Sequence, residues 1–247
     1  MNIGDIVCRK KYGGDIYFEI IDIKNEIYIL RGVEFRLLAD SEAEDLQLVS
    51  IEINEQDIDM EDKPYLKGKV LHIDGDKEYL QTCMKRYKKY GIQAYGYYMH
   101  EKEMKDNILS LLEKHQPNVL VITGHDALKR KSNPRDIDSY LHSKDYVEAI
   151  KLARTFERNK DHLVIFAGAC QSYYELLLAS GANFASSPER KNIHALDPVL
   201  VASQVASASV KNYVDLEKIV EKTSNKQYGI GGIDTKGVAR QIYPTGR

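Results

Sequence analysis

The chain has 247 residues, a formal net charge of -2 at pH 7, and 43% hydrophobic and 29% charged residues. This length allows one large domain or two smaller ones. The small net charge gives no electrostatic reason to expect binding to nucleic acid or to an anionic membrane. No run reaches the length of a membrane span, and the first ten residues lack the apolar core of a signal peptide. The three cysteines are too scattered for a disulfide framework or a zinc site, so we expect an intracellular protein without a metal or cofactor.

The first 50 residues alternate apolar and polar positions, which is typical of short strands. We predict strands at residues 3–8, 17–23, 26–31 and 34–39, joined by turns that contain Gly or Asn. Their tight spacing predicts a small SH3-like β-barrel over residues 1–50, for which a docking or packing role is favoured over an independent binding site. Residues 51–65 are acidic and poor in apolar side chains, which indicates a linker.

From residue 66 onward strands alternate with helices, the pattern of a parallel, doubly wound sheet with helices on both faces. We predict strands at residues 69–73, 92–99, 118–122 and 162–166. Apolar positions with helical spacing predict helices around residues 79–87 and 104–112 and at residues 145–158 and 175–180. The Gly-rich residues 228–237 are predicted to be a mobile loop. The sequence therefore predicts an α/β domain over residues 66–247.

Two of the predicted strands each end in a reactive side chain: His125 follows residues 118–122, and Cys170 follows residues 162–166. Ligands of an open parallel sheet gather beyond the carboxyl ends of its strands, so both side chains are expected at one edge. Cys170 would be the nucleophile, with its thiolate stabilised by the start of a helix. His125 would take the thiol proton, or pair with the thiolate as an imidazolium, and then protonate the leaving amine. The backbone N–H groups of Cys170 and Asp126 are expected to form an oxyanion hole.

Either residue alone is more often structural, and only their joint placement favours catalysis. Cys8 and Cys83 lie at apolar positions of a strand and a helix, and we predict a packing role for both. One rival is an amidohydrolase or glutaminase with a cysteine elbow at residues 168–172, in which His194 and Asp197 would follow the nucleophile. Another is a non-catalytic coat or scaffold protein that uses the barrel as an adaptor.

A strand that ends in histidine, followed by a strand that ends in Ala-Cys, resembles the caspase/clostripain/gingipain clan of cysteine peptidases. His125 lies 45 residues before Cys170, against about 50 in caspases. His125-Asp126 stands where caspases have His-Gly, and Gly168 stands where they have Gln, which rules out a caspase proper. Longer segments resemble the YabG family of sporulation-specific proteases of endospore-forming bacteria: VLHIDGD, VLVITGHDAL, FAGACQSYYELLLASGANFASSP, IHALDP and GIGGIDTKG.

This resemblance implies a caspase-like cysteine peptidase that cleaves spore-coat and germination proteins after arginine, with a dyad of Cys170 and His125. It implies a location in the cytoplasm of the sporulating cell or at the spore coat. An arginine preference requires a carboxylate at the base of the S1 pocket. The first candidates are Asp74 and Asp76, and the others are Asp126, Asp197 and Asp234.

Self-cleavage is a further expectation from this specificity. The basic loop at residues 127–138 and the terminal Arg247 are candidate cleavage sites. A solvated loop and a natural terminus are the plainer alternatives.

Overall fold

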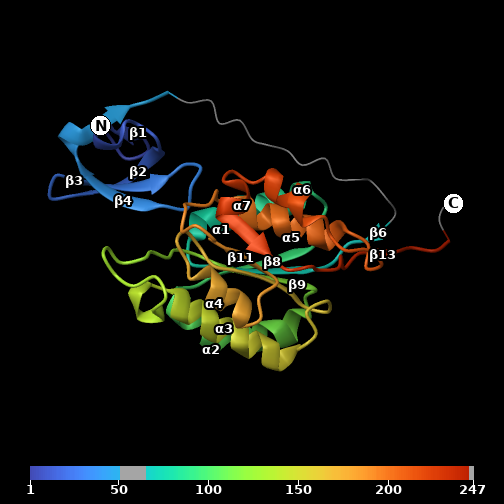
Figure 1. Ribbon diagram of the computed structural model, residues 1–247. Coiled ribbons are helices and arrows are strands. Elements are labelled where there is room, and N and C mark those ends of the chain that lie inside the picture. The colour runs from blue at the N-terminus through green and yellow to red at the C-terminus, as the bar shows by residue number, and fades with distance from the viewer. Residues whose placement is uncertain (51–64, 245–247) are drawn as a thin grey trace. The chain divides into compact units, whose positions relative to one another are not determined.

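The computed structural model describes residues 1–50 and 65–244 (Figure 1). The chain separates into two compact units, residues 1–58 and residues 59–247. The linker predicted at residues 51–65 falls almost wholly outside the described residues.

The first unit is a five-stranded antiparallel sheet in the order β4-β3-β2-β1-β5. Its elements are β1 (Ile6–Arg9), η1 (Lys10–Tyr12), β2 (Tyr17–Lys24), β3 (Ile27–Gly32), β4 (Leu38–Glu42), η2 (Ala43–Asp45) and β5 (Leu46–Leu48). Alternate residues point inward and form a small core of Val7, Phe18, Ile20, Leu30 and Leu46. The predicted strand at residues 34–39 begins too early, because the Gly32 N–H donates to the Leu37 carbonyl across a turn. The SH3-like identity of this unit stays a prediction.

The second unit is built on a six-stranded sheet in the order β12-β11-β10-β9-β7-β8. Its strands are β7 (Val70–Asp74), β8 (Ala94–Tyr98), β9 (Val119–Thr123), β10 (Val164–Ala167), β11 (Phe184–Ser186) and β12 (Ile230–Gly232). All neighbouring pairs are parallel except β11 and β12, which are antiparallel. A second, two-stranded sheet pairs β6 (Tyr65–Leu66) with β13 (Arg240–Gln241). The largely parallel sheet confirms the predicted α/β class.

The loop predicted at residues 228–237 is wrong in part, because β12 pairs with β11 there. Gly231 and Gly232 lie so close to Tyr174 and Phe184 that a Cβ on either would overlap a ring. These glycines therefore allow close packing of an edge strand, a use of glycine that resembles loop composition in the sequence.

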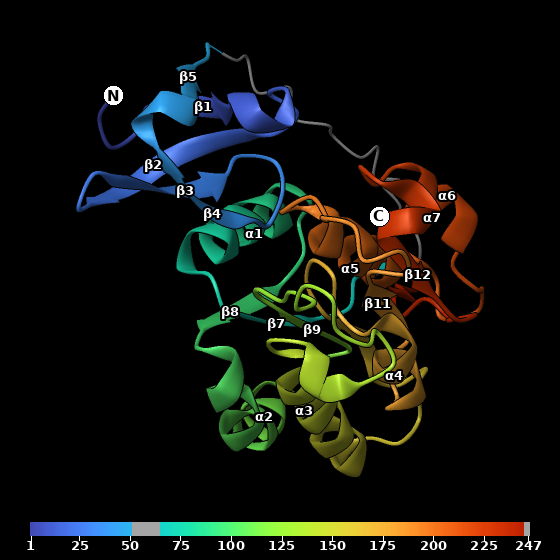
Figure 2. The same cartoon turned by 60° about the vertical axis from the view of Figure 1, so that its left-hand side comes forward.

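Helices cover both faces of this sheet (Figure 2). On one face lie α1 (Lys77–Lys89) and α5 (Asp197–Ser207), and on the other lie α2 (Glu101–His115), α3 (Ser143–Phe156) and α4 (Tyr174–Ala179). Shorter elements are η3 (Ile137–Ser139), α6 (Leu216–Glu221) and α7 (Lys226–Gly229). Every residue of β7, β9 and β10 is buried, and this explains why these strands are continuous apolar runs.

The strand order places the functional edge of the sheet. After β7 the chain adds β8 on one side and then β9 on the other, so the topological switch point lies between β7 and β9. Asp74 pairs with Thr123 in the register of these two strands, and Ala167 of β10 pairs with Ile122. The loops that follow β7, β9 and β10 therefore leave the sheet at one edge, where ligands of such sheets bind.

Candidate active site

His125 and Cys170 follow the neighbouring strands β9 and β10, so the structure brings them to the same edge of the sheet. The hydrogen bond of the His125 ring goes to Asp76, at 3.2 Å between Nε2 and Oδ2. Within residues 1–50 and 65–244, no hydrogen bond joins the His125 ring to the Cys170 thiol. The two groups share an edge but have separate partners.

Cys170 lies in a turn between β10 and α4. Its side chain is buried, and its Sγ accepts a hydrogen bond from the Ile193 N–H at 3.3 Å. The predicted helix start at Cys170 is wrong, because α4 begins at Tyr174. The Ser172 Oγ accepts the Ala169 N–H at 2.9 Å and closes a turn before the helix. The thiol is thus too far ahead of α4 for the helix dipole to act on it, since that effect fades within the first turn.

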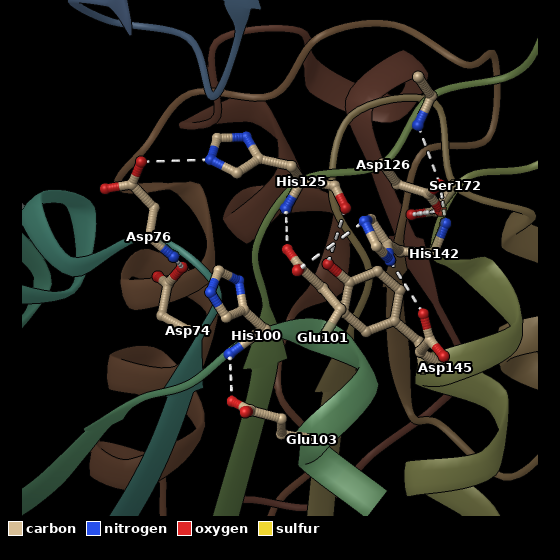
Figure 3. A network of polar contacts seen from close by, with 12 residues as sticks. Asp74, Asp76, His100, Glu101, Glu103, His125, Asp126, His142, Asp145 and Ser172 are labelled. Carbon is tan, nitrogen blue, oxygen red and sulfur yellow. Dashed lines mark hydrogen bonds and ion pairs between the residues drawn. The ribbon is translucent and has the colours of Figure 1, made fainter. Parts of the chain in front are cut away.

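His125 is held at its backbone and at its ring (Figure 3). Its N–H donates to Glu101 Oε1 at 2.8 Å, and its carbonyl accepts the Tyr146 hydroxyl at 3.2 Å. Glu101 is the first residue of α2, and Tyr146 belongs to α3. The imidazole is partly exposed, whereas the Asp76 carboxylate that it contacts is buried. Two helices therefore fix the backbone, and the loop after β7 fixes the ring.

Glu101 occupies space that only glycine leaves open. A Cβ on Gly75 or on Gly124 would overlap the Glu101 carboxylate. The Glu103 carboxylate accepts the His100 N–H at 3.1 Å and fixes the start of α2, where Glu101 lies. The two glycines after β7 and β9 thus allow a buried carboxylate to reach the backbone of the histidine loop.

Asp76 divides its two carboxylate oxygens between two tasks. Oδ1 accepts the N–H groups of Glu78 and Tyr79, at 2.9 and 3.0 Å, and so caps α1. Oδ2 contacts His125. Asp74 lies beside it and is fully buried, with Oδ1 accepting the Asp76 N–H at 2.9 Å and Oδ2 3.3 Å from His72 Nε2.

Asp126 joins three segments through four hydrogen bonds. Its Oδ1 accepts the N–H groups of Ala127 and His142, at 2.9 and 2.8 Å. Its Oδ2 accepts the hydroxyls of Ser143 and Ser172, at 2.5 and 2.9 Å. Burial raises the pKa of Asp126, although these hydrogen bonds oppose the shift. The carboxylate ties the loop after β9 to the start of α3 and to the turn that carries Cys170.

Two buried hydroxyls flank the end of β10. Thr123 is the last residue of β9, and Ser186 is the last residue of β11. Neither side-chain hydroxyl has a hydrogen-bond partner among the described residues. Between them lies Gly168, with φ at +102° and no room for a Cβ, which would stand 2.8 Å from the Ser186 carbonyl oxygen. Unsatisfied buried hydroxyls are uncommon, and here they lie at the ligand edge of the sheet.

His72, Asp74 and Cys83 form a buried group whose ligand atoms lie within 4.8 Å of one another. The His72 Nδ1 is 3.2 Å from the Tyr87 hydroxyl, which leaves Nε2 toward Asp74. A structural zinc takes four protein ligands, and among the described residues this group offers three. The Cys83 Sγ also lies 3.6 Å from the Ala195 carbonyl oxygen, as a buried thiol that donates a weak hydrogen bond would.

The other two acidic residues considered for the S1 pocket, Asp197 and Asp234, lie in less suitable places for binding a substrate side chain. Asp197 is buried at the start of α5, where its carboxylate accepts the N–H groups of His194 and Ser224. Asp234 is exposed and follows β12, and since β12 is antiparallel it lies toward the opposite edge of the sheet. The Asp197 contact with His194 is to the backbone, while the His194 Nδ1 accepts the Leu196 N–H at 3.0 Å.

Comparison with known proteins decides the family. The model of the family described as YabG peptidase U57 matches residues 2–64 and 52–244. The sporulation-specific protease YabG of Bacillus subtilis (strain 168) is 42% identical over 278 aligned residues, which cover 96% of each chain. The chain belongs to the YabG peptidase family. No solved structure matches it.

Membership of the YabG family confirms the resemblance and supports a protease associated with sporulation. No helix in the described part of this YabG-family chain has the length and apolar character to cross a membrane.

Several residues that build this site have no signal of their own in the sequence: Glu101, His142, Ser143, Tyr146 and Ser172. One signal was available, because Gly75 and Gly124 each follow a strand directly and precede a candidate side chain. Glycine at both places indicates that another group approaches the backbone closely. It does not say which group, so Glu101 could be found only in three dimensions.

Proposed function

We propose that this chain is a cysteine endopeptidase that cleaves proteins after arginine, with Cys170 as the nucleophile and His125 as its acid–base partner. Membership of a peptidase family supports proteolysis. The observation that carries the cysteine type is the placement of Cys170 and His125 at the ends of neighbouring strands, next to the switch point of the sheet. A thiol and an imidazole at one ligand edge are the groups that acyl transfer to sulfur requires.

In the first half of the reaction, His125 takes the thiol proton and Cys170 Sγ attacks the scissile carbonyl carbon. The carbon–nitrogen bond then breaks, a thioester forms on Cys170, and the leaving amine receives the proton from His125. Water hydrolyses the thioester while His125 accepts a proton from it and returns that proton to the thiolate. The Ile193 N–H on Sγ supports the mechanism, since a donor at that place favours the charged thiolate.

The developing oxyanion needs two donors, and we assign them to the backbone N–H groups of Cys170 and Asp126. In the described residues the Asp126 N–H donates no hydrogen bond, although the residue is buried. A buried donor without an acceptor is uncommon in folded proteins. The four bonds to the Asp126 side chain hold this N–H rigidly beside the loop that carries Cys170.

For the S1 pocket we retain Asp74 as the carboxylate that pairs with the substrate guanidinium. It ends β7 at the switch point, in register with Thr123 at the end of β9. The free hydroxyls of Thr123 and Ser186 lie at the same edge and add acceptors for guanidinium N–H groups. Asp76 caps α1 through Oδ1 and contacts the His125 ring through Oδ2, which suits a different role.

Hydrolysis of a small arginyl-amide fluorogenic peptide, with lysyl and aspartyl analogues alongside, tests the proposal. Activity confined to arginine, abolished in Cys170→Ala and in His125→Ala, is the expected result. Asp74→Asn should lower kcat/KM for arginine by about 10²-fold or more, because a guanidinium left without its carboxylate loses a charge-assisted pair. Asp234 is exposed, so Asp234→Asn is the matched control and should leave kcat/KM for the arginyl substrate unchanged. Activity that survives in Cys170→Ala would refute the cysteine mechanism.

One contact supports the alternative function of an amidohydrolase or glutaminase. The Ile193 N–H bonds to Cys170 Sγ, so His194 is one residue from a group on the thiol. A His194→Ala variant separates the two functions, because the peptidase requires His125 and not His194. A wild-type protein that fails to react with an arginyl thiol-reactive probe at neutral pH would favour the scaffold alternative.

The substrates that we propose are spore-coat and germination proteins, together with the chain itself. The curated relative is described as sporulation-specific, which supports the first group. Lys129, Arg130, Lys131 and Arg135 are exposed in the loop that follows His125, which supports self-cleavage there. Mass spectrometry should find a product in the wild type that Cys170→Ala lacks, and identical masses would contradict self-cleavage.

A further inference from the structure

We infer that Asp76 is the positioning residue of His125, so that the dyad acts with a third, orienting carboxylate. This inference rests on the proposed peptidase function. The Asp76 Oδ2 lies 3.2 Å from His125 Nε2, and the Asp76 carboxylate is almost fully buried. A buried carboxylate beside an imidazole nitrogen holds the ring in one orientation and one tautomer.

The cap of α1 keeps the Asp76 carboxylate in place. Oδ1 accepts two backbone N–H groups, from Glu78 and Tyr79, and the Asp76 N–H itself donates to Asp74. The two bonds to Oδ1 hold the carboxylate, and the third holds the Asp76 backbone, independently of the contact of Oδ2 with the ring. A helix cap alone would need only Oδ1, so the contact of Oδ2 with His125 is an additional function of the same residue.

The contact decides which ring nitrogen carries the proton. A carboxylate only accepts hydrogen bonds, so the neutral ring must donate Nε2–H to Asp76. Nδ1 then holds the lone pair and is the nitrogen that can accept the thiol proton. With an amide in place of the carboxylate, the side-chain NH₂ would donate to Nε2 and move the ring proton to Nδ1, where it blocks proton transfer from the thiol.

Asp76→Asn tests this inference because it preserves the cap, since Asn caps helices as well as Asp. We expect kcat for the arginyl substrate to fall by at least about 10²-fold, toward the loss of about 10⁴-fold seen when the carboxylate of a serine-protease triad becomes an amide. KM should change by no more than about threefold, because Asp76 does not bind substrate in this mechanism. Asp215→Asn is the matched control, since Asp215 caps α6 through the Lys218 N–H outside the site.

A second readout does not depend on activity. In a Cys170→Ala background, ¹⁵N NMR of the neutral histidine rings at alkaline pH reports the tautomer of His125, assigned by its loss in His125→Gln. We expect Nε2–H in Cys170→Ala and a larger Nδ1–H fraction in Cys170→Ala/Asp76→Asn. An unchanged tautomer, or an unchanged kcat in Asp76→Asn, would overturn the inference. An inert wild type with the expected tautomer shift would refute the peptidase function and support the coupling of Asp76 to His125.

Discussion

Replacing Asp126 by alanine should destabilise the second unit strongly. The change removes one buried acceptor from four donors. The hydroxyls of Ser143 and Ser172 can rotate, but the N–H groups of Ala127 and His142 cannot. A buried N–H without an acceptor costs about 1–3 kcal/mol, so the two together cost about 2–6 kcal/mol. Because a domain is stable by only about 5–15 kcal/mol, this loss is a large share of the total.

Asp126→Asn should cost less, about 1–2 kcal/mol, because its Oδ1 keeps the two N–H bonds. Its NH₂ group would face the hydroxyls of Ser143 and Ser172, which already accept the N–H groups of Tyr173 and Ala169. Those hydroxyls would then lose the acceptor for their own protons. The order of stability expected is wild type, Asp126→Asn, then Asp126→Ala.

Urea unfolding followed by far-ultraviolet circular dichroism and by tyrosine fluorescence measures these differences, since the chain has 17 tyrosines and no tryptophan. The exposed Asp234→Ala is the control and should stay within about 0.5 kcal/mol of the wild type. Equal midpoints for Asp126→Ala and Asp234→Ala would refute the role assigned to the four hydrogen bonds.

The pH dependence of the same comparison has a definite sign. Burial raises the pKa of Asp126 above 3.8, so the folded state binds its proton more tightly than the unfolded state. The contribution of this group to stability is therefore greatest below pH 3.8 and falls as the pH rises through the folded-state pKa. The amide of Asp126→Asn does not titrate. Relative to this variant, the wild type should therefore gain stability as the pH falls from about 7 toward about 4. A difference in the free energy of unfolding between the wild type and Asp126→Asn that becomes smaller as the pH falls over this range would contradict the prediction.

Three further changes probe the surroundings of the site. Gly168→Ala should cost about 1–3 kcal/mol in urea unfolding, because φ is +102° there and a Cβ meets the Ser186 carbonyl; unchanged stability would contradict the close approach. Glu101→Gln should stay near wild type in a thermal melt, whereas Glu101→Ala should lose about 1–3 kcal/mol with the acceptor of the His125 N–H, and equal melting temperatures would count against that bond. Arg154→Lys should cost about 1–3 kcal/mol in urea unfolding, because the Arg154 guanidinium donates to four acceptors that an ammonium cannot all reach. The site is buried, and this burial lowers the pKa of Arg154 to about 10. An unchanged free energy of unfolding would show that these bonds are dispensable.

The central strands were predictable because burial on both faces leaves a local signature. Strands β7, β9 and β10 have no exposed residue, so their sequences are short apolar runs that stand out between amphipathic helices. Each prediction lies within two residues of the strand observed. The shared edge of His125 and Cys170 followed from the same signal, because parallel strands end together.

Strands β11 and β12, which follow Gly181, were not predictable in this way. Strand β11 has three residues and β12 contains two glycines, so neither shows a period or an apolar run of useful length. Their pairing with each other and with β10 forms them, and the pairing of β12 with β11 joins segments about 45 residues apart. Only the folded sheet contains that information.

The carboxylates show the same difference between what the sequence determines and what only the folded structure determines. By itself the sequence determined that acidic residues follow β7 and β9, and that His125 and Cys170 end adjacent strands. The tertiary structure alone decided what each carboxylate contacts: Asp76 meets the His125 ring, Asp126 meets two serines, and Glu101 reaches the histidine backbone from a helix 24 residues away in the chain. A carboxylate in a turn has the same local sequence signal whether it caps a helix, orients a ring or binds a substrate. Its partners come from distant segments, and only the packing of helices on the sheet brings them within hydrogen-bond distance.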